Sequence, residues 1–255
     1  MSSIIYGPVP SWRLGRSLGI DLLSTKGKTC SFDCIYCQLG KTVHSLTERR
    51  QFVSLDELAA ELEGVKDIPA DYATFSGVGE PTLASNLGEA IELARSVLRL
   101  PVAVLTNSSL MTREDVRNEL GLADMVVAKL DAPDEELFHQ VNRPAEGQAL
   151  GQIIQAISLF REKYRGKLAL QMMFIEANKD HAGEMANIAE QLSPDEVQLN
   201  TPLRPCPIQP LTPEDISFIK REFSSLKNVV TVYGAPKPEV VPLDRKETLR
   251  RRPEE

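Results

Sequence analysis

The chain has 255 residues, of which 42% are hydrophobic and 25% are charged, and its formal net charge is −7. These proportions exclude a wholly disordered chain, and no apolar run reaches the roughly 18 residues that a membrane-spanning helix needs. The first residues lack the basic stretch and the cleavage site of a signal peptide, so we expect a cytoplasmic protein with no membrane partner.

Short apolar runs bounded by polar residues or glycine predict strands, and apolar stripes at helical spacing predict helices. In chain order, we expect a strand over 18–23, a helix from the capping-box sequence Ser54–Glu57 to about Gly64, and a strand over 72–76. An apolar stripe over 87–98 predicts the next helix, which strands over 102–105 and 125–130 follow. A second stripe over 150–164 predicts a helix before strands over 168–175 and 196–199. Another helix opens at Thr212–Asp215, a strand is expected over 229–233, and the tail from Asp244 is expected to be solvated and mobile.

The alternation of strands and helices predicts an α/β sheet of parallel strands covered by helices, because parallel neighbours need crossover connections. About six such units fit before residue 226, fewer than the eight of a closed barrel. An open barrel and a doubly wound sheet both satisfy this pattern. We expect residues 1–226, including an N-terminal segment over 1–17, to form the core, and residues 227–255 to form a C-terminal strand and charged tail.

Charge is unevenly distributed along the chain. Residues 1–50 contain seven Lys or Arg and three Asp or Glu, a net charge of +4, which leaves −11 for the remaining residues. An acidic surface repels nucleic acid, whereas a basic segment attracts anions. The basic segment therefore indicates an anionic partner, although chance placement of surface charges explains it equally well.

Three of the four cysteines, Cys30, Cys34 and Cys37, lie within eight residues of one another, directly after the first predicted strand. With Cys206 far away, this spacing indicates a metal site and not two disulfides. A zinc site needs a fourth ligand, for which His44 is the nearest candidate. A four-iron cluster held by three cysteines instead keeps one iron open for another ligand.

The sequence Cys30-x-x-x-Cys34-x-x-Cys37, with Tyr36 before the last cysteine, resembles the signature of the radical S-adenosylmethionine (SAM) enzymes. The resemblance implies a [4Fe–4S] cluster on the three cysteines, SAM bound at the open iron, and an electron donor of the flavodoxin or ferredoxin type. It also implies a partial (β/α)6 barrel, here with a short C-terminal extension. In such enzymes, reductive cleavage of SAM yields a 5′-deoxyadenosyl radical that removes hydrogen from the substrate. Cys206 is then either a radical relay or ligand at the barrel mouth, or an inert thiol.

The segment Phe75–Thr82 looks like the Gly-Gly-Glu motif of the family, whose backbone and acid hold the methionine amino group of SAM. Glycines allow close approach, and a carboxylate suits an ammonium group. Polar residues near the C-terminal ends of the strands are further candidates, because barrel active sites lie there. As turn formers or surface ion pairs they also have ordinary roles. The expected cofactor-binding residues are Tyr36, Gly77, Gly79, Glu80, Asn107, Ser108, Lys129, Asp131, Arg143, Gln171, Asn178 and Asn200.

Within the superfamily, the sequence resembles the tRNA wyosine synthases and their shorter Fe–S oxidoreductase relatives. The resemblance is carried by residues 6–20, 130–132 and 198–205. Wyosine synthases have extra cysteines before the main triad, whereas this chain has none before Cys30. Its net negative charge is also unlike that of a tRNA-binding protein, so we expect a shared framework without the wyosine reaction.

The sequence supports three hypotheses about function. The first is a radical enzyme that acts on a nucleotide, RNA or other anionic substrate, which the basic N-terminal segment favours. The second is an activating enzyme that places a radical on a partner protein. The third is a non-enzymatic module whose cysteines hold zinc. No catalytic residue is assigned, and the sequence contains neither a Gly-x-Ser-x-Gly elbow nor a P-loop.

Overall fold

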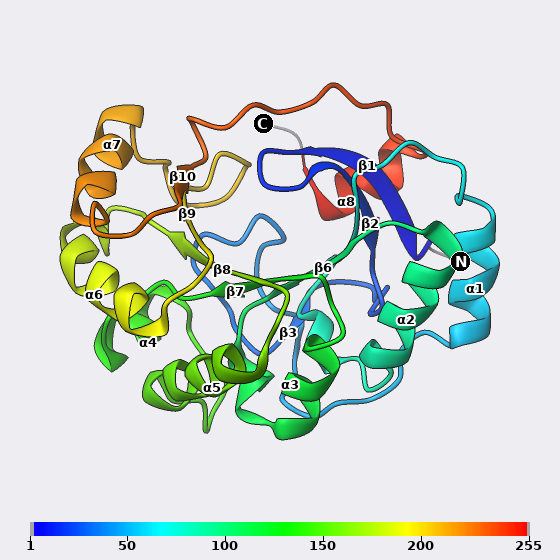
Figure 1. The fold of residues 1–255 in the computed structure, drawn as a ribbon, viewed down its shortest axis with the longest axis horizontal. Coiled ribbons are helices and arrows are strands. Elements are labelled where there is room, and N and C mark those ends of the chain that lie inside the picture. Colours follow the sequence, from blue (N-terminus) through cyan, green and yellow to red (C-terminus); the bar gives the residue numbers. More distant parts are fainter. Residues whose placement is uncertain (1–2, 254–255) are drawn as a thin grey trace.

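The computed structural model describes residues 3–253, in which eight strands form a single sheet that curls into an open barrel (Figure 1). Along the sheet, the order is β1-β2-β5-β6-β7-β8-β9-β10. From β2 onward the strands are parallel, and β1 pairs antiparallel with β2. Their bounds are Ile5–Ser11 for β1, Gly15–Ile20 for β2, Tyr72–Phe75 for β5, Val102–Thr106 for β6, Met125–Lys129 for β7, Lys167–Met173 for β8, Glu196–Asn200 for β9 and Val229–Thr231 for β10. The predicted partial barrel is confirmed.

Helices pack on the outer side of the curled sheet (Figure 1). They are α1 (Leu55–Glu63), α2 (Leu87–Leu98), α3 (Glu114–Leu120), α4 (Glu135–Val141), α5 (Leu150–Lys163), α6 (Ala182–Leu192) and α7 (Pro213–Glu222). The expected capping box is present at α1, where Ser54 Oγ accepts from the Glu57 amide. Short 3-10 turns, η1 (Pro81–Leu83), η2 (Ser109–Thr112) and η3 (Lys179–His181), follow β5, β6 and β8. Within residues 3–253, no helix has the length and hydrophobicity to cross a lipid bilayer.

The N-terminal segment contributes a strand that periodicity did not predict. β1 includes Pro8 and Pro10, and it lies at the edge of the sheet, where a strand tolerates residues without an amide proton. Together with β2 it forms a hairpin whose turn carries Trp12 and Arg13. A second, small sheet pairs β3 (Thr29–Cys30) with β4 (His44–Ser45) and frames the cysteine loop.

The charged tail was expected to be solvated, and this expectation is wrong. Residues Arg245–Arg251 form helix α8, which packs beside β1 (Figure 1). Arg251 is buried and donates from Nε to Asp21 Oδ2 at 2.7 Å, and its guanidinium lies 5.0 Å from the centre of the Tyr6 ring. The amide of Gly7 donates to Thr248 Oγ1 at 3.1 Å. A buried ion pair and an edge strand therefore hold the C-terminal helix against the barrel.

Candidate active site

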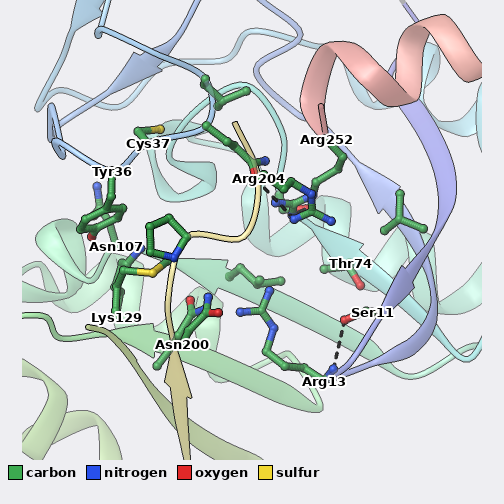
Figure 2. Close-up of a pocket in the computed structure, with 18 of the residues that line it drawn as sticks. Ser11, Arg13, Tyr36, Cys37, Thr74, Asn107, Lys129, Asn200, Arg204 and Arg252 are labelled. Atoms are coloured by element: carbon green, nitrogen blue, oxygen red, sulfur yellow. Dashed lines mark hydrogen bonds between the residues drawn. The ribbon is translucent and has the colours of Figure 1, made fainter. Parts of the chain in front are cut away.

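A cavity of about 260 Å³ opens at the C-terminal ends of the parallel strands (Figure 2). It is lined by the cysteine loop, by residues that end β5 to β9, by the turn of the β1–β2 hairpin and by the segment after α8. This is the edge of the sheet where barrel enzymes place their chemistry. The cavity brings together eight of the twelve expected cofactor-binding residues, which are Tyr36, Gly77, Gly79, Glu80, Asn107, Lys129, Gln171 and Asn200, and all three clustered cysteines.

The cysteine loop presents three free thiols to this cavity. Cys30 ends β3 and is buried, whereas Cys34 and Cys37 are partly exposed. The amide of Cys37 donates to the Cys34 carbonyl at 3.1 Å, which turns the loop back on itself. Burial raises the pKa of the Cys30 thiol to about 12, and the neighbouring Lys28 ammonium opposes that rise. Because a thiol must lose its proton to bind a metal, a cation beside the thiols favours the ligating form.

Lys28 shows that the loop fits an anionic metal cluster. Its side chain is 3% exposed, and among the described residues its Nζ has no hydrogen-bond partner. The nearest carboxylate, that of Asp33, lies 3.7 Å away. Burial lowers the pKa of this ammonium, but the negative charges that Cys37, Cys30, Cys34 and Asp33 can carry together raise it by more. A buried ammonium without a hydrogen-bond partner is costly, and the negative charge of a thiolate-ligated cluster would add to that of Asp33 in compensating it.

The cysteine loop and the Gly-Glu motif are packed directly against each other. The amide of Glu80 donates to the Thr29 carbonyl at 3.1 Å, and the amide of Thr29 donates to the Val78 carbonyl at 3.0 Å. A Cβ atom on Gly79 would lie 1.6 Å from the Thr29 carbonyl oxygen, so only glycine fits at this position. This contact fixes the start of the cysteine loop relative to the carboxylate.

Glu80 is buried, and its carboxylate accepts hydrogen bonds from three neighbours. Oε1 accepts from the Thr82 amide at 3.1 Å, from Thr82 Oγ1 at 2.6 Å and from Thr106 Oγ1 at 2.7 Å, whereas Oε2 accepts from the Asn107 amide at 2.6 Å. Burial raises the pKa of the carboxyl group, and these donors oppose the rise. Because each carboxylate oxygen has about two lone-pair sites, Oε2 retains one for a further donor, such as an ammonium group.

Asn107 and Asn142 connect the polar strand ends to the cysteines. Asn107 Nδ2 donates to Ser31 Oγ at 2.9 Å and lies 3.4 Å from Cys30 Sγ. Asn142 Nδ2 donates to Asp131 Oδ2 at 2.8 Å and lies 3.5 Å from Cys34 Sγ. Amide groups beside sulfur atoms are among the contacts that tune iron–sulfur clusters.

Tyr36 is held in place by Asp131, whose carboxylate accepts a short hydrogen bond from the tyrosine hydroxyl. Lys129 Nζ lies 4.6 Å from the centre of the Tyr36 ring and 4.0 Å from Asp131 Oδ2. Burial, followed by the Asp131 charge, raises the pKa of the tyrosine, so it stays protonated and donates. Tyr36 therefore presents a fixed, neutral face between the cysteine loop and the cation of Lys129.

Four of the expected cofactor-binding residues do not line the cavity. Ser108 is buried and donates to the Lys129 carbonyl at 3.0 Å, and Asn178 donates to the Asp131 and Met173 carbonyls. Asp131 lies behind Tyr36, and Arg143 is exposed on the surface. Ligand contact by these four residues stays a prediction, and the contacts described give Ser108, Asp131 and Asn178 positioning roles.

Cys206 and His44, the remaining candidate ligands, also lie outside the cavity lining. Cys206 is partly exposed, and its Sγ lies 3.2 Å from the Ile208 carbonyl. His44 is exposed in β4. Among residues 3–253, no three His, Cys, Asp or Glu side chains lie close enough to hold a single metal ion.

Several cavity residues were missed by sequence reasoning. The cations Lys28, Arg13, Arg204 and Arg252 all line the cavity, and Thr82 and Thr106 hold the Glu80 carboxylate. Thr82 is the last residue of the recognised segment Phe75–Thr82, and Thr106 directly precedes Asn107, so their positions carried a signal. The arginines come from three distant segments, and only the folded chain brings them together.

Comparison with known proteins assigns the chain to a family. A family model described as the radical SAM superfamily matches residues 25–189. The UPF0026 protein MJ1312 of Methanocaldococcus jannaschii is 37% identical over 235 residues, covering 89% of this chain and 72% of that protein. Residues 25–189, which the family model matches, contain the cysteine loop, the Gly-Glu motif and the strand ends as far as β8.

Two solved structures share the fold. Streptococcus suis SuiB bound to S-adenosylmethionine matches with a TM-score of 0.62 and 16% identity, over 80% of this chain and 48% of SuiB, so this chain spans about half of that protein. Archaeal TYW1 matches with a TM-score of 0.56 and 13% identity, over 82% of this chain and 72% of TYW1. The curled sheet is thus a fold that proteins with little sequence similarity to this chain also adopt.

Proposed function

Because the chain belongs to the radical SAM superfamily, with a [4Fe–4S] cluster and SAM as its cofactors, we propose that it removes a hydrogen atom from an anionic substrate bound in the cavity. When bound, the two cofactors supply the one-electron chemistry that activates a C–H bond. Enzymes of this kind need a reductant, and we expect a flavodoxin or a ferredoxin to supply it. The observation that carries the proposal is the charge of the cavity.

Residues of this chain have separate tasks in the proposed reaction. Cys30, Cys34 and Cys37 would hold the cluster, and the free lone pair on Glu80 Oε2 would accept the ammonium group of SAM. Tyr36, fixed by Asp131, and the strand-end side chains wall the cavity and would orient the groups bound in it. The chain thus binds and orients, while the cofactors carry out the difficult chemical step.

An anionic substrate is favoured by the cavity lining. Six cationic side chains face the cavity, which are Arg13, Lys28, Lys129, Arg204, Lys237 and Arg252, and among the described residues Glu80 is the only acid that does so. A cavity lined by charges of one sign concentrates ligands of the opposite sign. This balance contrasts with the net charge of −7 on the whole chain.

The test measures 5′-deoxyadenosine release by anaerobically reconstituted enzyme with dithionite, SAM and defined pools of compounds. Nucleotides, sugar phosphates and RNA form the anionic pools, and nucleosides, sugars and peptides form the comparison pools. We expect an anionic pool to raise the release at least tenfold above the substrate-free rate. Stimulation by neutral compounds or by peptides alone would contradict the proposal and favour the protein-activating alternative.

A further inference from the structure

Two nitrogen atoms of the half-buried Arg13 side chain have no hydrogen-bond partner in the part of the chain that the structure describes. It lies in the turn of the β1–β2 hairpin, and its side chain extends into the cavity (Figure 2). Nε and Nη1 are inaccessible to solvent and have no hydrogen-bond partner among residues 3–253. The guanidinium lies 5.1 Å from the centre of the Trp12 ring. Buried N–H groups without acceptors are costly, so this arrangement favours a bound anion.

Two further arginines, Arg252 and Arg204, repel the positive charge of Arg13. Burial, followed by the like charges of Arg252 and Arg204, lowers the pKa of Arg13 to about 9, while the charge of Glu196 acts in the opposite direction. The three guanidinium groups come from separate segments: the hairpin turn, the loop after β9 and the residue after α8. Their convergence is therefore a property of the tertiary fold and not of a charged run in the sequence.

Docking of α8 holds Arg252 at the cavity before any ligand binds. The preceding residue, Arg251, forms the buried ion pair with Asp21, and Arg252 Nη2 lies 3.3 Å from Ser76 Oγ. That hydroxyl is also 2.6 Å from the Tyr6 hydroxyl. A site whose groups are positioned in advance loses little conformational freedom when it binds its ligand.

The cofactors do not supply the missing anion. Three thiolates with a [4Fe–4S] core carry a formal charge of about −1, and SAM carries about +1, so together they leave the charge of the cavity nearly unchanged. A negatively charged substrate would supply the balancing charge. Guanidinium forks match the oxygens of a phosphoryl group, whose charge of nearly −2 compensates several arginines at once.

We propose that Arg13, Arg252 and Arg204 form a subsite that binds a phosphoryl group of the substrate, at the end of the cavity made by the hairpin and the C-terminal segment. This inference rests on the proposed function and adds the chemical class of the anion. A phosphorylated small molecule would be anchored here with its remaining atoms extending toward the cysteine loop.

The test uses inorganic phosphate as the probe, titrated calorimetrically into the reconstituted enzyme with SAM at constant ionic strength. We expect one phosphate to bind per chain, and R13Q and R252Q each to weaken binding at least tenfold. R13K keeps the positive charge but lacks the planar guanidinium group, so it should weaken phosphate binding less than R13Q does. It replaces R13Q as the test variant if R13Q fails to fold. R165Q, which changes an exposed arginine between α5 and β8, is the matched control and should bind phosphate as the wild type does.

The outcomes separate the subsite from the proposed function. Equal phosphate affinity in R13Q and wild type, or equal affinity for acetate and phosphate, overturns the subsite. If anions stimulate the release of deoxyadenosine but the enzyme binds no phosphate, the proposed subsite is wrong and the proposed function stands. Phosphate binding without stimulation by any anionic pool supports the subsite and overturns the proposed function.

Discussion

Gln38 Nε2 donates a hydrogen bond of 2.8 Å to the backbone carbonyl of Arg251, across 213 residues of sequence. Gln38 directly follows the last clustered cysteine, and its Oε1 accepts from Arg204 Nη1 at 3.4 Å. One side chain thus connects the cysteine loop to the C-terminal helix and to the loop after β9. The cluster site and the cationic end of the cavity are held as one structure.

Replacement of Arg251 by methionine should reduce the free energy of unfolding by about 3–5 kcal/mol, because it leaves the buried Asp21 carboxylate without its cation. Denaturant unfolding of the apoprotein measures the loss. R16M removes the partly exposed ion pair with Asp71 and should have a much smaller effect, since solvent screens that pair. Equal losses in the two variants would show that the pair with Asp21 has no special importance.

Replacement of Cys34 by alanine should abolish cluster binding and deoxyadenosine release, because only two cluster ligands remain. Iron content and visible absorbance after anaerobic reconstitution measure the first effect, and product analysis measures the second. C206A is the control, since Cys206 lies outside the cavity lining, and it should keep both properties. Full SAM cleavage by C34A under reducing, oxygen-free conditions would refute the ligand assignment.

Replacement of Glu80 by glutamine should weaken SAM binding by about ten- to a hundredfold, because it removes the negative charge expected to accept the ammonium group. The new amide also turns one acceptor into a donor that faces the Thr82, Thr106 and Asn107 donors. Equilibrium binding of SAM to reconstituted protein measures the change. E63Q alters an exposed residue of α1 and should bind SAM normally; unchanged affinity in E80Q would exclude the proposed contact.

Replacement of Gly79 by alanine should destabilise the protein by about 1–3 kcal/mol or prevent folding, because the added Cβ overlaps the Thr29 carbonyl. G151A is the matched control: this glycine is exposed in α5, and apart from its chain neighbours and the backbone of its own helix no atom lies within 4 Å of the added Cβ. The control should gain about 0.5–1 kcal/mol from higher helix propensity. Thermal unfolding distinguishes the two, and equal stability in both variants would contradict the close approach.

Replacement of Lys28 by methionine should lower the reduction potential of the cluster by roughly tens of millivolts, because a nearby positive charge stabilises the reduced, more negative state. A redox titration followed by electron paramagnetic resonance measures the potential. K26M removes an exposed charge two residues away and should shift the potential less. If the reduction potential of K28M equals that of the wild type, the charge of Lys28 does not influence the cluster.

Local patterns predicted the barrel well. The strand over 72–76 and the helix that Ser54 caps appear in the structure within a residue or two of their expected bounds, because short-range periodicity and capping determine them. The cysteine loop and Glu80 were also found from sequence, since their motifs are contiguous. These features depend on neighbours along the chain.

Features that depend on distant partners were not predicted. The tail appeared solvated because three consecutive arginines are usually exposed, and nothing near them in sequence indicates that Asp21 pairs with Arg251. Edge strand β1 was not predicted because Pro8 and Pro10, which lack an amide proton, argue against a strand in the sequence pattern. Asn142, beside Cys34, lies 108 residues from it in sequence, and only the crossover after β7 brings it near.

The docking of α8 has a consequence for biosynthesis. Because Arg252 lines the cavity and the carbonyl of Arg251 holds Gln38, the wall of the active site stays incomplete until residues 251 and 252 have left the ribosome. A nascent chain that already displays its thiols has no closed chamber around them. Closure of the chamber therefore waits for synthesis of α8, whatever the order in which iron and sulfide are delivered.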